Sequence, residues 1–315
     1  MTVFLISLVC CIVAIIAWNF FRLLGAVLPA QVKHILVGVQ PAAITASIPK
    51  IIWSYWQQAP TPELILQCQA NWKLYAPDYE IRILSKDNLP QWISQESFIQ
   101  GFDSLPAFRQ ADWIRLQLLK QHGGVWIDAS TILTQDLKWV QLTQQEWQSE
   151  YVGFYIDGLS NRPDQPMLEN WFMACIPNSQ FMVDLCDEFN RALTLGGNKY
   201  LAELARQHKL ERVVQKLNPS TQRYLLMHVA ASALLDRNLS FYRLVLLRAE
   251  DSALGFHEAL KWRKRHLYAK LALLPCPKKL PALIKLRGND RRIFEQYLAR
   301  HWINPHSFLA NYLKL

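Results

Sequence analysis

The sequence has few cysteines, and none has the spacing of a zinc site. Cys10 and Cys11 are adjacent near the N-terminus, and the other four of the six are scattered without a CxxC pair. This pattern excludes a zinc finger or ribbon. It favours reduced, partly buried thiols over a disulfide framework, as in a cytoplasmic domain.

Charge is missing from the first part of the chain. No charged side chain occurs from Thr2 to Phe21, and no Lys or Arg precedes this apolar run. The lack of a basic start argues against a cleavable signal peptide, and the run approaches the about 20 apolar residues that span a bilayer. We therefore predict a transmembrane anchor over residues 1–21 and a stem over residues 22–47.

The orientation of that anchor depends on the few charges after it. Arg22, Lys33 and His34 all follow the apolar run. Because positive charge tends to remain on the cytoplasmic side, they favour a single-pass membrane protein with the main domain in the cytoplasm. A Golgi-type luminal orientation is the alternative.

Acidic residues are scarce near the C-terminus. Residues 241–315 carry 15 Lys or Arg against 5 Asp or Glu, a balance of +10, so the rest of the chain sums to −1 and the net charge is +9. Clusters such as Trp262–His266 are suited to anionic membrane headgroups, or they form a solvated basic face. We predict a basic, largely helical part over about 241–315, with the membrane as a partner.

The stretch 108–131 carries the strongest pattern. Its first half predicts an amphipathic helix, in which Asp112 and Arg115 fall inside the apolar arc. A pair spaced i, i+3 can form an internal ion pair, although burial costs several kcal/mol per ion. The alternative is that both groups face a cavity that holds a polar ligand.

The second half of this stretch predicts a strand that ends at a carboxylate. Gly123 and Gly124 end the helix, because glycine adopts the conformation needed there. Residues 125–128 follow as a short strand with Trp126 and Asp128 on one face. Ligands of open α/β sheets bind beyond the carboxyl ends of strands. Asp128 is therefore a candidate ligand-binding residue, with a turn or capping aspartate as the alternative.

Further elements follow from composition. Residues 150–156 predict a strand, and residues 167–175 and 181–193 predict helices. Tyr224 and His228 lie one helical turn apart, so they share a cleft or simply face the core.

Several linked motifs resemble one family of enzymes. The run with Ala111-Asp112, Arg115, Gly123-Gly124, Trp126 and Asp128 resembles the signature of DXD-containing glycosyltransferases. It is most similar to the capsular polysaccharide synthesis proteins and the family-32 mannosyltransferase-like enzymes. The segment Ile48–Trp53 is similar to the family's first strand, and a later helix with Asn71, Trp72 and Tyr75, followed by Pro77–Glu80, is similar to the part that leads into its second strand. The resemblance covers about Ile48 to Thr131.

The resemblance implies a fold, a reaction and roles for matching residues. The fold would be α/β, with a GT-A-like glycosyltransferase domain over 48–315. Asp128 and Arg115 would be catalytic, and the donor would be bound by the residues Ile52, Trp53, Asp112, Arg115, Trp126, Asp128 and Ser130. Residues 169–172 would line the donor or acceptor cleft, although Trp171 and Phe172 also suit a core.

One position departs from the family pattern. Many relatives carry a second DXD aspartate that binds the metal, and here the position is Ser130. The resemblance implies Mn²⁺ or Mg²⁺ at Asp128 and Ser130, yet a hydroxyl is a weaker ligand for such cations than a carboxylate. His257 and Glu258 are candidates for compensating ligands, or ordinary helix or loop residues. Lys285 resembles a late Lys-Leu element and would steady the leaving diphosphate.

The sequence as a whole predicts a glycosyltransferase. It would move a sugar, with retention as the resemblance implies, from a nucleotide-sugar donor to a glycan or lipid-linked acceptor in capsular or cell-surface polysaccharide synthesis. One alternative is a catalytically inactive donor-binding or scaffolding protein. Another is a binder of anionic polymer or nucleic acid through the basic C-terminal part, which leaves the ordered motifs unexplained; we expect no nucleic-acid partner.

Overall fold

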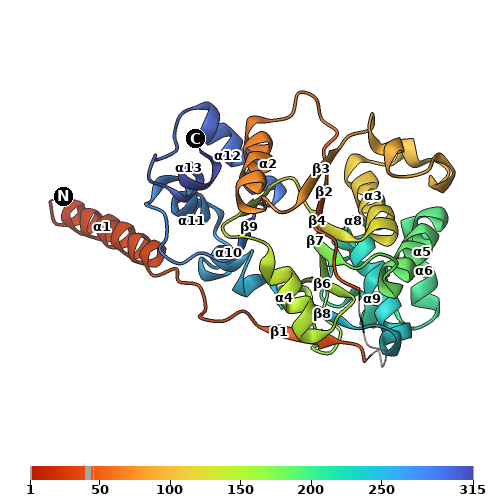
Figure 1. Cartoon of the computed structure of the whole chain (residues 1–315). Helices are drawn as coiled ribbons and strands as arrows, with labels where there is room; N and C mark the ends of the chain where they lie inside the picture. The colour runs from red at the N-terminus through yellow and green to blue at the C-terminus, as the bar shows by residue number, and fades with distance from the viewer. Residues whose placement is uncertain (1, 40–43, 45, 315) are drawn as a thin grey trace.

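The centre of the protein is a mixed β-sheet. The computed structural model describes residues 2–39, 44 and 46–314. Its main sheet has seven strands in the order β1-β8-β6-β7-β4-β2-β3 (Figure 1). The strands are β1 (His34–Val37), β2 (Ile51–Tyr55), β3 (Glu80–Leu84), β4 (Gly124–Ile127), β6 (Tyr151–Tyr155), β7 (Leu168–Cys175) and β8 (Leu244–Arg248). A second, two-stranded sheet pairs β5 (Thr131–Leu133) with β9 (Leu283–Lys285).

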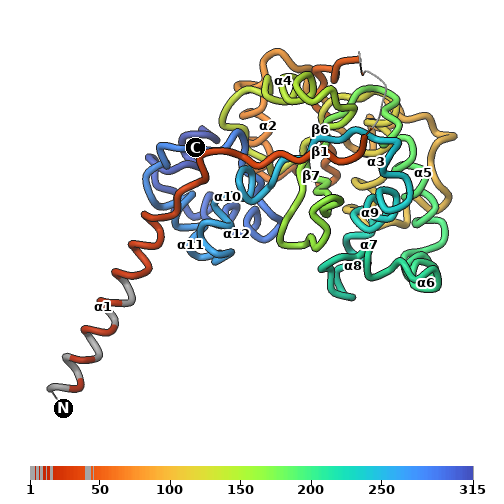
Figure 2. The backbone as a smooth tube through the Cα atoms, turned by 90° about the horizontal axis from the view of Figure 1, so that it is seen from below, coloured from red at the N-terminus to blue at the C-terminus, as the bar shows by residue number. Residues whose placement is uncertain are grey.

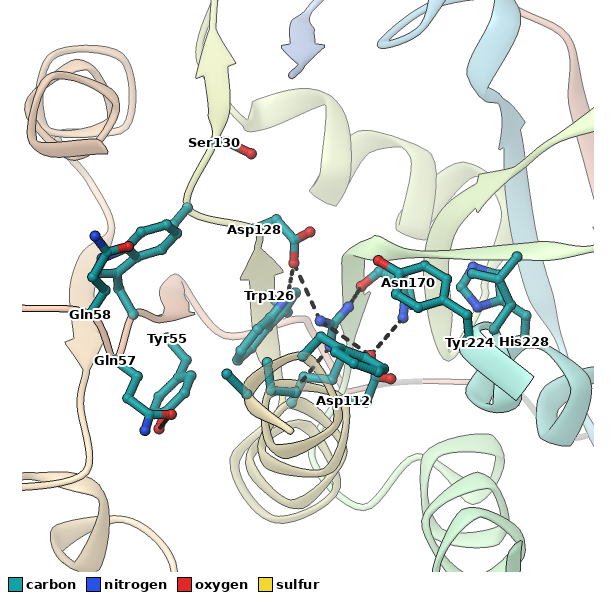
Figure 3. Close-up of a pocket in the computed structure, with 17 residues that line it drawn as sticks. Tyr55, Gln57, Gln58, Asp112, Trp126, Asp128, Ser130, Asn170, Tyr224 and His228 are labelled. Carbon is teal, nitrogen blue, oxygen red and sulfur yellow. Dashed lines mark hydrogen bonds and ion pairs between the residues drawn. The ribbon is translucent and has the colours of Figure 1, made fainter. Parts of the chain in front are cut away.

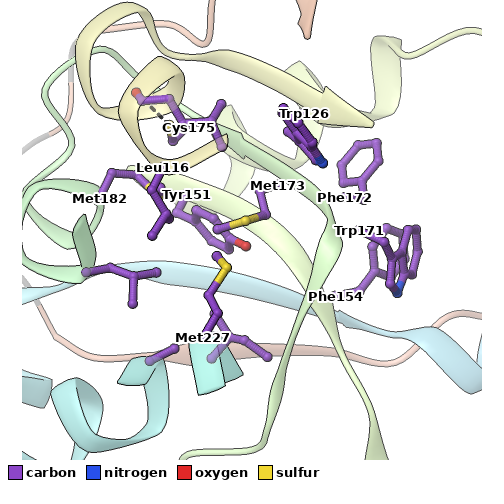
Figure 4. Packing of buried hydrophobic residues seen from close by; sticks show 14 of the residues in the cluster. Leu116, Trp126, Tyr151, Phe154, Trp171, Phe172, Met173, Cys175, Met182 and Met227 are labelled. Atoms are coloured by element: carbon purple, nitrogen blue, oxygen red, sulfur yellow. Dashed lines mark hydrogen bonds between the residues drawn. The ribbon is translucent and has the colours of Figure 1, made fainter. Parts of the chain in front are cut away.

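Helices cover both faces of the main sheet (Figure 1). Because side chains alternate along a strand, Tyr151 and Phe154 of β6 point to opposite faces. Tyr151 packs against Phe181, whereas Phe154 packs against Trp139. The helices of this part of the protein are α3 (Ala107–His122), α4 (Lys138–Trp147), α5 (Gln180–Leu195), α6 (Gly197–Arg206), α7 (Leu210–Val214), α8 (Pro219–Tyr224) and α9 (Leu226–Asn238). Figure 4 shows the large side chains that fill this core.

A second hydrophobic cluster lies at the C-terminal end of the chain. It is built around Leu271, Phe294 and Phe308, and Leu28 packs into it from the N-terminal side. The helices here are α2 (Glu63–Tyr75), α10 (Gly255–Ala259), α11 (Lys264–Tyr268), a π-helical turn (Ala269–Leu273), α12 (Gly288–Ala299) and α13 (Phe308–Leu313). Short 3₁₀ turns lie at Leu89–Gln91, Gln95–Ser97, Phe102–Ser104, Asp157–Leu159, Leu239–Phe241 and Ala249–Asp251.

Two glycines connect α3 to β4 as the sequence predicts. Gly123 has φ of 62° and Gly124 has φ of 94°, values that glycine adopts without a steric penalty. A Cβ at Gly123 would lie 2.6 Å from the backbone nitrogen of Pro177, and one at Gly124 would lie 2.8 Å from the carbonyl oxygen of Ile51. This tight connection brings β4 beside β2 in parallel, with Trp53 opposite Trp126.

The helix predicted over residues 167–175 is wrong. Residues Leu168–Cys175 form β7, which lies between β4 and β6 and pairs with both in antiparallel register. The context of a central strand outweighs local propensity. The predicted strand at 150–156 is confirmed as β6, and the helix at 181–193 is confirmed as α5.

The predicted transmembrane anchor is also wrong. Among the residues that the structure describes, which leave out Met1, no helix is long and apolar enough to cross a membrane. The corresponding helix, α1 (Thr2–Leu24), projects from the body (Figure 2). Its C-terminal end is held by polar contacts: Asn19 Oδ1 lies 2.8 Å from His266 Nε2, and Lys270 Nζ donates to the carbonyl oxygen of Leu23 at 2.9 Å.

The predictions of membrane location, membrane partner and stem depended on the anchor and are revised here. The single-pass membrane location with a cytoplasmic catalytic domain is corrected, and the membrane as a partner has no support. Part of the segment predicted as a stem, 22–47, instead forms β1, which pairs with β8. Residues 40–43 and 45 of that segment lie outside the described residues.

Candidate functional site

A cavity of about 350 Å³ opens where β2 and β4 end. These strands are parallel neighbours, so the segments that follow them meet at one edge of the sheet. Helices α3, α8 and α9 and the strand β7 complete the walls (Figure 3). The lining residues are Tyr55, Trp56, Gln57, Gln58, Ala107, Phe108, Ala111, Asp112, Arg115, Trp126, Asp128, Ala129, Ser130, Asn170, Tyr224, Leu225 and His228.

Asp112 lies in the α3 wall at the centre of a buried network. Its Oδ2 accepts from Arg109 at 3.0 Å, and its Oδ1 accepts from Asn170 Nδ2 at 2.9 Å and lies 3.5 Å from Arg115. Desolvation raises the pKa of Asp112 and outweighs the opposing charges of Arg115 and Arg109. The internal ion pair and the cavity-facing group, which the sequence left as alternatives, therefore both apply.

Asp128 lies at the end of β4 in a more open position. Its side chain keeps 28% of its surface exposed. Lys285 Nζ donates to Oδ2 at 2.8 Å, and Trp126 Nε1 donates to Oδ1 at 3.0 Å. Desolvation raises the pKa of Asp128, but Lys285 and Arg115 outweigh it, so the pKa lies below its usual range. This carboxylate is ionised at neutral pH.

Arg115 connects the two carboxylates. Its guanidinium lies 3.5 Å from Asp112 and 3.4 Å from Asp128. It stacks over the ring of Trp126 at 4.8 Å and donates to the backbone carbonyl of Asn170. An arginine fixed on several sides is well placed to recognise an anion, because little further side-chain order is needed on binding.

The set of donor atoms near Ser130 does not fit a divalent cation. Ser130 Oγ donates to the carbonyl oxygen of Leu286 at 2.8 Å, and Lys285 Nζ lies 3.2 Å from the same Oγ. The ammonium of Lys285 thus contacts both atoms that would bind the metal. Within the described part of the chain, no group of three or more His, Cys, Asp or Glu side chains is arranged to hold a metal ion.

Comparison with known proteins identifies the family. Residues 35–193 match the family model described as capsular polysaccharide synthesis protein, which is about half of the chain. The chain belongs to this family. The family resemblance of the sequence is thereby confirmed, and the matched region contains Asp112, Arg115, Trp126, Asp128 and Ser130.

One curated relative and two solved structures are similar to this family member. A protein named O-glycosyltransferase braB, from Annulohypoxylon truncatum, is 27% identical over 150 residues, which cover 42% of this chain. The match spans only 35% of that relative's length.

The solved structures are more distant. "PaToxG Glycosyltransferase" is 15% identical with a TM-score of 0.36, covering 70% of this chain and 86% of its own. "Crystal structure of the UDP-bound glycosyltransferase domain from the YGT toxin" is 10% identical with a TM-score of 0.36, covering 85% and 82%.

Four of the predicted site residues of this family member lie away from the cavity. Ile52 and Trp53 are fully buried in the sheet, and Trp53 Nε1 donates to the carbonyl oxygen of Gly123 at 2.8 Å. His257 is buried beside Asp290, with Nε2 2.9 Å from Oδ2. Glu258 accepts from Trp262 at 2.8 Å. Neither His257 nor Glu258 lines the cavity.

Some lining residues, among them Gln57 and Gln58, were not predicted as part of the site, whereas residues 169–172 were expected to line a cleft. Gln57 and Gln58 follow β2, and their position after a buried strand is a signal that sequence reasoning could have used. Asn170 lines the cavity, whereas its neighbours Trp171 and Phe172 are core residues. For His228, the structure favours the shared cleft: it lines the cavity with Tyr224, and its buried Nδ1 has no hydrogen-bond partner among the described residues.

Proposed function

We propose that this protein is a glycosyltransferase. It transfers a sugar from a nucleotide-sugar donor to a glycan or lipid-linked acceptor in capsular or cell-surface polysaccharide synthesis. The observation that carries the proposal is the ionised Asp128 at the carboxyl edge of parallel strands, flanked by two cations beside a cavity of about 350 Å³. The name of the curated relative, an O-glycosyltransferase, supports the same reaction class.

The donor would lie across the cavity from the β2 end to the β7 wall, in a GT-A-like arrangement. Arg115 is the cation that lines the cavity, and it suits a diphosphate, because a planar guanidinium binds phosphate oxygens in pairs. Asp128 suits the hydroxyls of the sugar, which donate to a carboxylate. The base would lie against Tyr55 and Gln57 rather than the buried Ile52 and Trp53.

The chemistry then depends on charge that develops as the bond to the leaving diphosphate breaks. Arg115 is held in place before the donor binds, so it stabilises that negative charge with little reorganisation. The ionised Asp128 stabilises the positive charge that develops on the sugar. The resemblance to the family implies retention of configuration. No step is assigned to a divalent cation, since the candidate metal-ligand atoms at Asp128 and Ser130 do not fit one.

The substitution Asp128→Asn tests this proposal. It keeps the shape of the side chain and removes the charge, so we expect transfer to fall by about 10²–10³-fold, which is typical for loss of one charge-stabilising group. Release of nucleoside diphosphate from a panel of nucleotide sugars, with a glycan acceptor mixture, measures it. Unchanged turnover in the folded variant would refute the assignment.

An inactive donor-binding or scaffolding protein is the second candidate. It is favoured by one observation, the serine at position 130, which donates to a backbone carbonyl instead of supplying a second carboxylate. It predicts that the wild-type protein binds a nucleoside diphosphate but neither hydrolyses nor transfers any donor in the panel.

A further inference from the structure

The side chain of Lys285 lies between the two atoms where the family pattern places a metal. Its Nζ is 2.8 Å from Asp128 Oδ2 and 3.2 Å from Ser130 Oγ. Its side chain is only 10% exposed. An ammonium carries positive charge and donates to oxygen, so it can meet the same two oxygens that a bound cation would meet.

The backbone holds this lysine in place. In the small sheet, Lys285 is opposite Thr131. The amide of Leu286 donates to the carbonyl oxygen of Ser130 at 3.0 Å, and Ser130 Oγ donates to the carbonyl oxygen of Leu286 at 2.8 Å. The amide of Lys285 itself donates to Ala253 at 3.1 Å. The ammonium is therefore ordered before any ligand binds.

The charges near Asp128 disfavour a further cation. Arg115 lies 3.4 Å from Oδ1 and Lys285 lies 2.8 Å from Oδ2. Arg115 is shared with Asp112, which also pairs with Arg109, so three cations meet two carboxylates here. A divalent ion at Asp128 would lie close to Arg115 and Lys285 and be repelled by them. An anionic diphosphate would instead be attracted by the net positive charge.

We infer that Lys285 replaces the divalent cation, so that this protein binds the diphosphate of its donor without a metal. The inference rests on the proposed function. Lys285 does not line the cavity itself; it is a positioning residue that neutralises and orients Asp128 and adds positive charge behind it. Arg115 supplies the direct contact.

Nucleoside diphosphate binding by the full chain tests the inference. Titration calorimetry with ADP, GDP, CDP and UDP is carried out in excess EDTA and again in saturating Mn²⁺. For the wild-type protein we expect at least one of them to bind with a Kd that differs by less than about threefold between the two conditions. A wild-type Kd that is more than about tenfold weaker in EDTA overturns the inference while leaving the proposed function intact.

The variant Lys285→Met separates metal replacement from general support of the fold. Methionine keeps a long side chain and removes the charge, which frees Asp128 and Ser130. We expect binding in EDTA to weaken by about tenfold or more and Mn²⁺ to restore part of it. Mn²⁺ binding measured by electron paramagnetic resonance should be detectable in the variant and absent in the wild type.

Lys270→Met is the matched control, because Lys270 and Lys285 are both 8% exposed as whole residues, but Lys270 contacts α1 rather than Asp128. It should keep metal-independent binding. Equal weakening by Lys285→Met with and without Mn²⁺ would assign Lys285 a structural role only and overturn the inference. If no nucleoside diphosphate binds to the wild-type protein in either EDTA or Mn²⁺, the proposed function is refuted as well. This outcome distinguishes failure of the proposed function from failure of the inference alone.

Discussion

The two walls of the cavity each present an aspartate, but the two residues are in different environments. On the α3 wall, the side chain of Asp112 is 9% exposed and contacts Arg109, Arg115 and Asn170. At the end of β4, Asp128 is 28% exposed. The pKa of Asp112 is raised, with desolvation as the main cause, whereas that of Asp128 is lowered by its cations. Burial and access to a ligand thus separate two residues of the same type.

This difference assigns the two walls different tasks. Both carboxylate oxygens of Asp112 contact other side chains of the protein. Its network therefore mainly orders the start of α3 and positions Arg115. Asp128 is ionised and reaches the cavity, so it remains available to a hydroxyl-rich ligand. Arg115 belongs to both walls and links the ordered network to the binding surface.

The largest effect is expected from Asp112→Ala, a substitution in the α3 wall. Asp112→Ala leaves Arg109 and Arg115 buried beside no carboxylate on that side, and removing one partner of a buried ion pair costs about 3–5 kcal/mol. We expect the free energy of unfolding, measured with urea, to fall by about that amount. A loss below about 1 kcal/mol would contradict the view that this wall is structural.

A smaller effect is expected from Trp126→Phe, a substitution in the wall at the end of β4 that carries Asp128. The substitution removes the Nε1 donor to Asp128 but keeps an aromatic ring beneath Arg115. Because Asp128 is partly exposed and keeps Lys285, we expect the free energy of unfolding to fall by about 1 kcal/mol. The rate of transfer from the nucleotide-sugar donor should also fall in this variant. A loss as large as that of Asp112→Ala would mean that both walls are equally buried.

The smallest effect is a pair of opposite pH dependences. A lowered pKa in the folded state means that Asp128 contributes stability above about pH 4, the unfolded value, and that this is lost as pH falls through the folded pKa. For Asp112 the folded pKa is raised, so its contribution is complete below about pH 4 and is lost as pH rises through the folded pKa.

Urea unfolding from about pH 3 to about pH 7 checks this. Relative to the wild type, Asp128→Asn should become less stable with rising pH, and Asp112→Asn should become more stable. Slopes of the same sign for the two variants would contradict the assignment of opposite shifts.

Much of the site could be predicted because it is local in sequence. A helix, two glycines and a short strand place Asp112, Arg115, Trp126 and Asp128 within one continuous stretch, and the structure brings all four to one cavity. Helical periodicity and strand alternation depend only on neighbouring residues, so one sequence is enough to detect them.

Other predictions failed where the residues that surround a position in the fold are distant from it in the sequence. Residues 168–175 form a strand because they pair with β4 and β6. Trp53 is buried because Trp92, His122 and Arg82 pack around it, which leaves Tyr55 and Trp56 to reach the cavity. For residues 1–21, apolar composition alone suggested an anchor that the described helices do not contain.

The sequence by itself determined the family and the position of Asp128 after a strand. Only the tertiary structure decided which cation meets that carboxylate. Lys285 is separated from Asp128 by 157 residues, and the pairing of β9 with β5 brings the two together. The physical reason is that an ion pair forms across space, whereas the periodic patterns of a sequence report only on neighbours along the chain.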